Sequence, residues 1–368
     1  MPLDPEVRRV VGTLPTVDWE SGPDPAALRA ARRRLPGPVP PGLEMHTVED
    51  RTVRAESGAC DGDGHGHAVS SGGDDHAVRA RESSACDGDG HGRGRGHAVR
   101  VRCYRPSARR DLPLVLFFHG GGFVLGDLDT QDALARRIAR DAEAVVVSVD
   151  YRLAPEHPCP AAPDDAFTAY RWALRHAAAE LGADPGRIAV CGESAGGNLA
   201  AGLCLRARDA GLPLPVLQLL WYPSTDFRDT PSRHENAHAP LLNRAALRWL
   251  DAQYLPPALR AEPPSWAAPA RAASLHGLPA AYVLVAQYDP LRDEGADYAR
   301  RLRDAGVPVR FDLCPTMPHG FLSLIGSVPS CAAAAADSFA ALRQALWPHT
   351  PTAGDLPPAP PTARRSQS

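Results

Sequence analysis

From about residue 98 onward, short hydrophobic runs alternate with amphipathic segments along the chain. A continuous apolar run is typical of a strand buried on both faces, whereas apolar positions that recur every three or four residues are typical of a helix. The runs that predict strands are HAVRVRCYRP, LPLVLFFHG, AVVVSVDYRL, RIAVCG, LPVLQLLWYP, AAYVLVAQYD and VRFDLCP. The segments that predict helices are TQDALARRIARDA, PDDAFTAYRWALRHAAAELG, AGGNLAAGLCLRARDAG, EGADYARRLRDAG and CAAAAADSFAALRQAL. This order predicts an α/β fold with a mostly parallel sheet and helices on both of its faces.

Three less regular stretches precede, interrupt and follow this alternation. Residues 1–45 carry short helical patterns broken by prolines, so we expect a wrapped cap arm there rather than a core element. Residues 225–278 are rich in proline and hold one good helix, NRAALRWLDAQY, which predicts a cap insertion over the carboxyl ends of the strands. We assign residues 46–347 to the main domain. The tail at 348–368 lacks apolar periodicity, and we expect it to be disordered.

A tandem near-duplication lies inside the main domain. Residues 54–69 recur in altered form at 79–99, and the whole loop at 54–99 is rich in Gly, Asp and His. Thiolates and imidazoles are ligands that zinc prefers, and the two copies hold six such side chains, namely Cys60, His65, His67, Cys86, His91 and His97. Their spacings fit no established zinc pattern. We therefore expect an expanded surface loop between two strands, without a metal.

Composition limits the partners and the compartment. A net charge of -3 and a pI near 6.5 give no electrostatic reason to expect nucleic acid or an anionic membrane as a partner. The start, MPLDPEVRRVVGTLP, lacks the apolar stretch of a signal peptide, and no later run approaches bilayer length, so we expect a cytoplasmic protein. The eight cysteines form no CxxC pair and are expected to be free thiols. We interpret the arginine cluster at 29–34 as the solvated face of a helix.

The chain has no lysine, since all 40 basic residues are arginine. This excludes a phosphate-loop lysine, a Schiff-base lysine for pyridoxal phosphate and a serine-lysine dyad. If a hydroxyl is to be activated as a nucleophile, a histidine must serve as its base.

The pentapeptide at 192–196, GESAG, follows a predicted strand and precedes a predicted helix. A tight turn between a strand and a helix holds a serine hydroxyl out of the sheet, and it needs small residues at its flanks, which Gly192 and Gly196 provide. The positive end of the following helix dipole also points at this position. These features favour Ser194 as a nucleophile over a surface or capping serine.

Candidates for the acid and the base follow Ser194 in the chain. Asp289 lies at the end of the strand-like run AAYVLVAQYD, and His319 lies just beyond the next predicted strand. Parallel strands end at the same edge of a sheet, so we expect both side chains near Ser194. Asp293 and Glu294, which follow Asp289, are expected to cap the next helix. The order nucleophile, acid, histidine is that of α/β-hydrolases.

The glycines of HGGGF at 119–123 come directly after the strand-like run LPLVLFF. Glycines let the backbone approach a ligand closely, and this loop should lie beside the serine. We expect the N–H groups of Gly121 and Gly122, together with that of Ala195, to stabilise an oxyanion. A phosphate-binding loop is disfavoured because there is no lysine and no GxGxxG spacing.

These motifs resemble the hormone-sensitive-lipase-like family of α/β-hydrolases, which includes many bacterial carboxylesterases. The resemblance covers about residues 43–347 and is carried by HGGGFVLGD, DYRLAPEHPCPAAPDD, GESAGGNLA, YDPLRDEGADYARRL and MPHGF. It implies an eight-stranded sheet, a helical cap and no cofactor. It also implies a triad of Ser194, Asp289 and His319 with oxyanion donors at Gly121, Gly122 and Ala195.

The chain departs from the family pattern at two places. The loop at 54–99 is much longer than the usual connection between the first two strands, and Glu193 stands where relatives commonly have aspartate, so its longer side chain should change contacts near the turn. Some family members are hormone-binding receptors that lack the catalytic histidine, whereas this chain keeps His319.

We therefore expect a serine carboxylesterase that hydrolyses short- to medium-chain acyl esters through an acyl-enzyme. Two alternatives stay open. An amide or acetyl-ester hydrolase would use the same triad, and a non-catalytic ligand-binding module would use the same scaffold. The partner is then a small-molecule ester, with no nucleic acid and no stable membrane insertion. A homodimer through an edge strand or the last helix is compatible with the pattern.

Overall fold

The computed structural model describes residues 1–34, 42–54 and 97–348. Eight strands form one sheet in the order β1-β2-β4-β3-β5-β6-β7-β8. Their bounds are β1 Thr47–Arg54, β2 Ala98–Arg105, β3 Leu112–Phe118, β4 Val145–Asp150, β5 Ala183–Glu193, β6 Gln218–Trp221, β7 Ala281–Tyr288 and β8 Val309–Pro318. The strands from β4 to β8 in this order are parallel, while β2 pairs antiparallel with both β1 and β4. The expected mostly parallel, eight-stranded α/β fold is confirmed.

The edge strand β1 could not be found from hydrophobicity. Its sequence TVEDRTVR is largely polar, and only Val53 of the strand is fully buried. It is held instead by eight register pairs with β2, from Thr47 opposite Arg105 to Arg54 opposite Ala98. A polar edge strand of this kind also discourages pairing with another chain.

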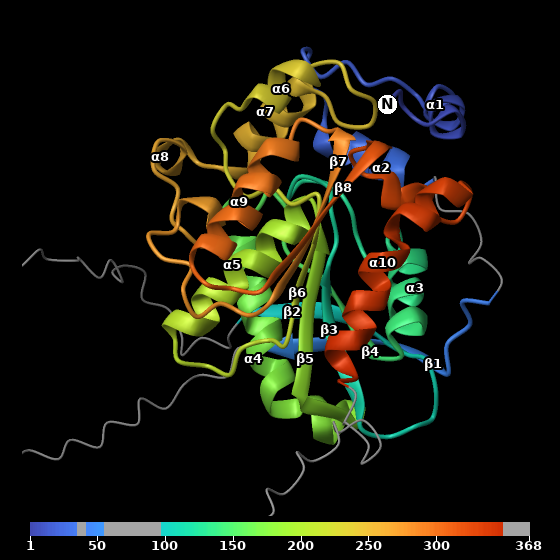
Figure 1. Cartoon of the computed structure of the whole chain (residues 1–368), viewed down its shortest axis with the longest axis vertical. Helices are drawn as coiled ribbons and strands as arrows, with labels where there is room; N and C mark the ends of the chain where they lie inside the picture. Colours follow the sequence, from blue (N-terminus) through green and yellow to red (C-terminus); the bar gives the residue numbers. More distant parts are fainter. Residues whose placement is uncertain (35–41, 55–96, 349–368) are drawn as a thin grey trace, which may run out of the picture.

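Helices cover both faces of the sheet (Figure 1). One face carries α3 Asp132–Ala142 and α10 Pro329–Leu346, and the other carries α4 Ala161–Leu181, α5 Ala195–Asp209 and α9 Arg292–Asp304. Because successive side chains of a strand point to opposite faces, the buried residues divide into two clusters, one on each side of the sheet. Val115 and Phe117 of β3 face α3 and α10, whereas Leu114 and Leu116 face α4 and α5.

Short helices gather beyond the carboxyl ends of the parallel strands, at the top of Figure 1. From the insertion come α6 Pro231–Glu235, α7 Arg244–Tyr254, α8 Pro257–Arg260 and the 3-10 turn η1 Pro269–Arg271, and from the amino-terminal arm come α1 Pro5–Val11 and α2 Pro25–Arg32. A further 3-10 turn, η2 Phe321–Leu324, follows β8. The predicted helix NRAALRWLDAQY is α7, and its Trp249 packs on Trp19 of the arm with ring centroids 5.5 Å apart. The arm and the insertion therefore meet above the sheet.

The interpretation of the arginine cluster at 29–34 as a solvated helix face is wrong for Arg29. Its guanidinium donates to the carbonyl oxygens of Val124 and Ala154, both at 2.7 Å, and to both carboxylate oxygens of Glu156 at 2.8 Å. Arg33 of the same cluster binds Asp127 at 2.6 Å. These bonds tie α2 to the loops after β3 and β4, a long-range arrangement that the local sequence pattern does not encode.

Some sequence predictions fall on residues outside the described ranges. The duplicated loop at 54–99 lies there except for its ends, and so does the tail from 349 onward. The six described cysteines are free and buried, in agreement with the composition. No helix in the described ranges is long and apolar enough to cross a bilayer. The boundaries of the cap arm and the insertion stay predictions.

Candidate active site

Ser194 occupies the sharp turn between β5 and α5. Its backbone has φ 55° and ψ -118°, a conformation that a non-glycine residue adopts only under strain. The flanking glycines are required by close backbone approaches: a Cβ at Gly196 would overlap the carbonyl oxygen of Phe118, and one at Gly192 would overlap the carbonyl oxygen of Gly196. The pentapeptide thus has the structure predicted for it, with the serine raised above the end of the central strand.

His319 and Asp289 complete a chain of hydrogen bonds with Ser194. His319 Nε2 lies 2.9 Å from Ser194 Oγ, and His319 Nδ1 lies 2.8 Å from Asp289 Oδ2. His319 follows β8 and Asp289 follows β7, so the order of the parallel strands places both beside the end of β5. All three residues are buried. The structure brings together the three residues that the sequence singled out.

The Asp289 carboxylate is itself held in place. Its Oδ1 accepts the backbone N–H of Leu291 at 2.7 Å, which leaves Oδ2 for the imidazole. Asn236 of the insertion donates to the Asp289 carbonyl oxygen at 3.2 Å. A carboxylate fixed in this way selects the imidazole tautomer that carries its proton on Nδ1, so that Nε2 is free to accept the serine proton.

The prediction that Asp293 and Glu294 cap the next helix is wrong. The N-cap of α9 is Leu291, which makes no side-chain cap bond. Asp293 instead accepts the N–H of Ser232 at 2.7 Å, and buried Glu294 accepts the N–H of Thr225 at 2.8 Å and binds Arg233 at 2.8 Å. Both carboxylates therefore fasten the insertion to α9, because the insertion presents unpaired N–H groups to them.

The glycine loop after β3 lies against the serine turn. Gly121 and Gly122 have φ values of 124° and 61°, and within the described ranges the N–H of neither has an acceptor. Ala195 is the first residue of α5, where a helix leaves its N–H groups unpaired. Gly122, Ser194 and Ala195 line one cavity. Gly121, Gly122 and Ala195 are the oxyanion donors that the sequence predicts, and this role stays a prediction.

His119, which opens the glycine loop, is fully buried and stacks on Tyr151 with ring centroids 4.3 Å apart. Tyr151 donates its hydroxyl to the His119 carbonyl oxygen at 2.7 Å. Burial lowers the pKa of His119, so the ring is neutral near pH 7. The contacts of His119 with Tyr151 therefore hold the start of the glycine loop in place.

Glu193 links the glycine loop to the serine turn, a role that the sequence did not define. Its Oε1 accepts the backbone N–H of Gly120 at 3.2 Å, and its Oε2 accepts the hydroxyl of Tyr222 at 2.6 Å. The Tyr222 ring in turn packs on His319 with centroids 4.8 Å apart. The longer side chain that sets Glu193 apart is therefore what spans from the turn to the loop.

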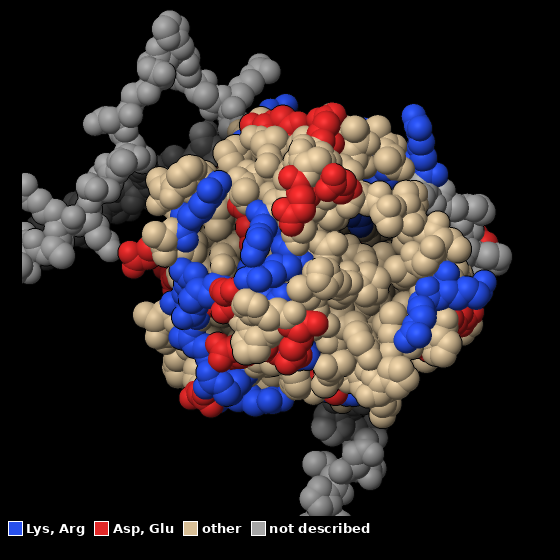
Figure 2. Space-filling view, turned by 90° about the horizontal axis from the view of Figure 1, so that it is seen from above, with Lys and Arg blue, Asp and Glu red and all other residues tan. Residues whose placement is uncertain are grey.

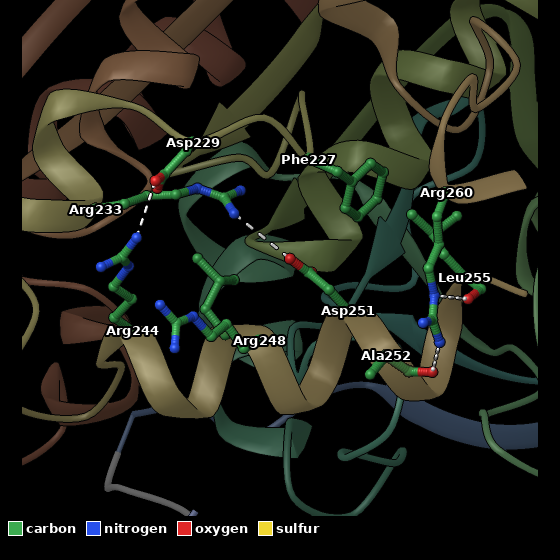
Figure 3. Close-up of a pocket in the computed structure, with 10 residues that line it drawn as sticks. Phe227, Asp229, Arg233, Arg244, Arg248, Asp251, Ala252, Leu255 and Arg260 are labelled. Atoms are coloured by element: carbon green, nitrogen blue, oxygen red, sulfur yellow. Dashed lines mark hydrogen bonds and ion pairs between the residues drawn. The ribbon is translucent and has the colours of Figure 1, made fainter. Parts of the chain in front are cut away.

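The cavity at Ser194 is small and mostly apolar. Its walls come from Phe123 of the glycine loop, from Leu242, Leu247 and Leu250 of the insertion, and from Leu291 at the start of α9. Leu247 and Asp251 of α7 also line a larger neighbouring cavity of about 320 Å³ (Figure 3). Sequence reasoning located this wall in the insertion but not its residues, since the face that α7 turns toward Ser194 depends on tertiary packing. Within the described ranges, no three His, Cys, Asp or Glu side chains gather to hold a metal ion.

The sheet is eight-stranded and mostly parallel, and a strained serine stands on the turn after β5. This serine is bonded to a histidine that follows β8, and the histidine to an aspartate that follows β7, an arrangement that defines an α/β-hydrolase. Comparison with known proteins agrees, because residues 115–323 match the α/β-hydrolase fold family. The chain belongs to this family, and its resemblance to the hormone-sensitive-lipase-like branch is confirmed.

Individual relatives are similar over most of the main domain. Esterase LipI of Mycobacterium tuberculosis is 49% identical over 252 residues, which are 67% of this chain and 78% of that protein. Carboxylesterase NlhH of the same species is 50% identical over 254 residues, which are 67% of this chain and 79% of that protein. The crystal structure of a thermostable esterase from Pseudomonas putida superposes with a TM-score of 0.78 at 31% identity, covering 94% of this chain and 98% of that one.

Proposed function

We propose that this protein is a serine carboxylesterase that hydrolyses short- to medium-chain acyl esters. The observation that carries the proposal is the continuous chain Ser194 Oγ, His319 and Asp289, with bonds of 2.9 and 2.8 Å, at a cavity bordered by unpaired N–H groups. Relatives with the printed names esterase and carboxylesterase at about 50% identity support the same reaction. The small apolar cavity at Ser194 favours short acyl groups over long ones.

The first half of the reaction forms an acyl-enzyme. His319 Nε2 takes the proton of the Ser194 hydroxyl as Oγ attacks the ester carbonyl. The imidazolium that results faces the Asp289 carboxylate, which stabilises its charge and keeps the ring in place. The N–H groups of Gly121, Gly122 and Ala195 bind the developing oxyanion, and those of Gly121 and Gly122 have no competing acceptor within the described ranges. His319 then gives its proton to the departing alcohol oxygen.

The second half repeats this sequence with water. His319 takes a proton from a water molecule as the water oxygen attacks the acyl carbonyl, and the same three N–H groups hold the second oxyanion. Collapse of this intermediate breaks the bond to Ser194 Oγ, to which His319 returns a proton.

A substrate panel with a covalent probe tests this proposal. We expect p-nitrophenyl acetate and butyrate to be turned over well, the long-chain palmitate poorly, and the corresponding p-nitroanilides very slowly. A fluorophosphonate should label Ser194 and abolish turnover. Anilide turnover as fast as that of the esters would assign an amide hydrolase instead. Absence of both turnover and labelling would assign a binding module.

A further inference from the structure

The cavity beside the Ser194 site is rich in arginine. Leu247 and Asp251, one turn apart on α7, line both cavities, so the two lie against each other. The arginines that line the larger one are Arg233, Arg244, Arg248 and Arg260 (Figure 3). Seen from above, basic side chains gather on one part of the face that carries the insertion, with acidic side chains between them (Figure 2).

The four guanidinium groups differ in how far they are already paired. Arg233 binds Glu294 at 2.8 Å and Asp251 at 3.5 Å, so its charge is balanced. Arg244 binds Asp229 at 2.9 Å, and this carboxylate is about half exposed to solvent. The Asp251 carboxylate repels anions less than a free one would, because Arg233 lies against it.

The other two arginines have no carboxylate partner in the described ranges. Arg260 donates to the backbone carbonyl oxygens of Leu255 and Ala252 at 2.9 and 3.0 Å, which leaves its positive charge unbalanced. Arg248 makes no hydrogen bond and no ion pair with any described residue. An unpaired guanidinium offers a planar, two-pronged donor that fits a carboxylate.

We propose that this cavity binds a carboxylate carried by the substrate, so that the enzyme prefers esters with a negatively charged group several bonds from the ester carbonyl. Arg248 is the principal donor, and Arg244 is the second, held back by Asp229. The scissile ester lies at Ser194, and the chain passes Leu247 and Asp251 to reach the arginines. The larger cavity follows α7 from Arg244 to Leu255, a length of about 16 Å at 1.5 Å per residue, which accommodates a chain of several carbons. This inference rests on the proposed esterase function.

The test compares matched charged and neutral esters. Monoethyl adipate and ethyl hexanoate place the carboxylate on the acyl side, whereas 6-acetoxyhexanoic acid and hexyl acetate place it on the alcohol side. In Arg248→Gln, kcat/KM for the charged ester of one pair should fall about fivefold while that for its neutral partner changes less than twofold. The preference should also weaken in high salt, since the site is open to solvent.

Two further variants sharpen the test. Asp229→Asn should free Arg244 and raise kcat/KM for the charged ester about twofold. Arg300→Gln removes the same charge from α9, outside the cavity lining, and serves as the control that should leave both esters unchanged. If Arg248→Gln and the double variant with Arg244→Gln change charged and neutral esters equally, the carboxylate site is refuted. If the wild-type protein turns over neither the charged nor the neutral member of any pair, the proposed esterase function fails instead.

Discussion

Replacement of Glu193 by alanine tests whether this side chain positions the glycine loop. The change removes two hydrogen bonds, one from the Gly120 N–H at 3.2 Å and one from the Tyr222 hydroxyl at 2.6 Å, and leaves both donors buried without a partner. Hydrogen bonds to a charged acceptor contribute about 1.5–3 kcal/mol each, so we expect the free energy of unfolding to fall by about 3–6 kcal/mol. A domain stability of about 5–15 kcal/mol leaves the variant folded in most of this range.

The effect on catalysis follows from the place of Gly120 in the chain. It directly precedes Gly121 and Gly122, whose N–H groups are the proposed oxyanion donors. Loss of one such donor costs about 10²–10³-fold in kcat, and a loosened loop should cost less. We therefore expect Glu193→Ala to lower kcat for p-nitrophenyl butyrate about tenfold to a hundredfold with little change in KM.

Two companion variants separate positioning from stability. Glu193→Gln keeps an oxygen for the Gly120 N–H and an amide for Tyr222, so its kcat should stay within about threefold of the wild type. Tyr222→Phe removes only the second bond and should lower the free energy of unfolding by about 1–3 kcal/mol. Urea unfolding gives the stability of each variant. If Glu193→Ala loses stability but keeps kcat within twofold, Glu193 is merely structural and the positioning role is refuted.

Three further predictions concern the acid, the serine turn and a buried carboxylate. Asp289→Asn should lower kcat by about 10³–10⁴-fold because the imidazole loses its orienting charge, whereas Asp293→Asn, which only loosens the insertion, should stay within about threefold; the reverse order would reassign the acid. Gly196→Ala should abolish turnover because the new Cβ would overlap the Phe118 carbonyl oxygen. Gly211→Ala has open space around its Cβ and should lower the free energy of unfolding by only about 1–2 kcal/mol. If the two variants affect turnover equally, the steric requirement at Gly196 is contradicted. Burial raises the pKa of Asp251 from 3.8 to about 6, so its ionisation disfavours the folded state and stability should fall as pH rises from about 4 to 6. With the side chain 24% exposed, Asp251→Asn should gain about 2 kcal/mol relative to the wild type between pH 4 and 7 in denaturant unfolding, and a pH-independent difference would refute the raised pKa.

The parts of the site that sequence could predict are those in which local backbone chemistry demands particular residues. The turn at Ser194 needs glycine on both sides because backbone carbonyl oxygens would overlap a Cβ at Gly192 or Gly196. The pentapeptide can therefore be recognised from the sequence alone. Asp289 follows β7, whose apolar run is almost entirely buried, while His319 follows the more polar β8, and the parallel topology brings both to one edge.

The parts that could not be predicted depend on contacts between distant segments. The local sequence predicts that Arg29 is a surface residue of its helix, yet its guanidinium donates to the carbonyl oxygens of Val124 and Ala154, more than 90 residues away. Glu294 has the position of a helix cap, but the insertion supplies better donors in Thr225 and Arg233. Strand β1 is largely polar because it lies at the sheet edge, so its pairing rather than its hydrophobicity defines it.

The central claim, that Ser194 is the nucleophile of an ester hydrolase, is tested most directly by mass spectrometry of the acyl-enzyme. After rapid acid quench of the wild-type protein with p-nitrophenyl butyrate, we expect a butyryl adduct on the peptide that contains Ser194, and we expect it to accumulate when deacylation is slowed in the Asp289→Asn variant. Ser194→Ala should show neither the adduct nor turnover above background. An adduct on another residue, or full turnover by Ser194→Ala, would contradict the mechanism.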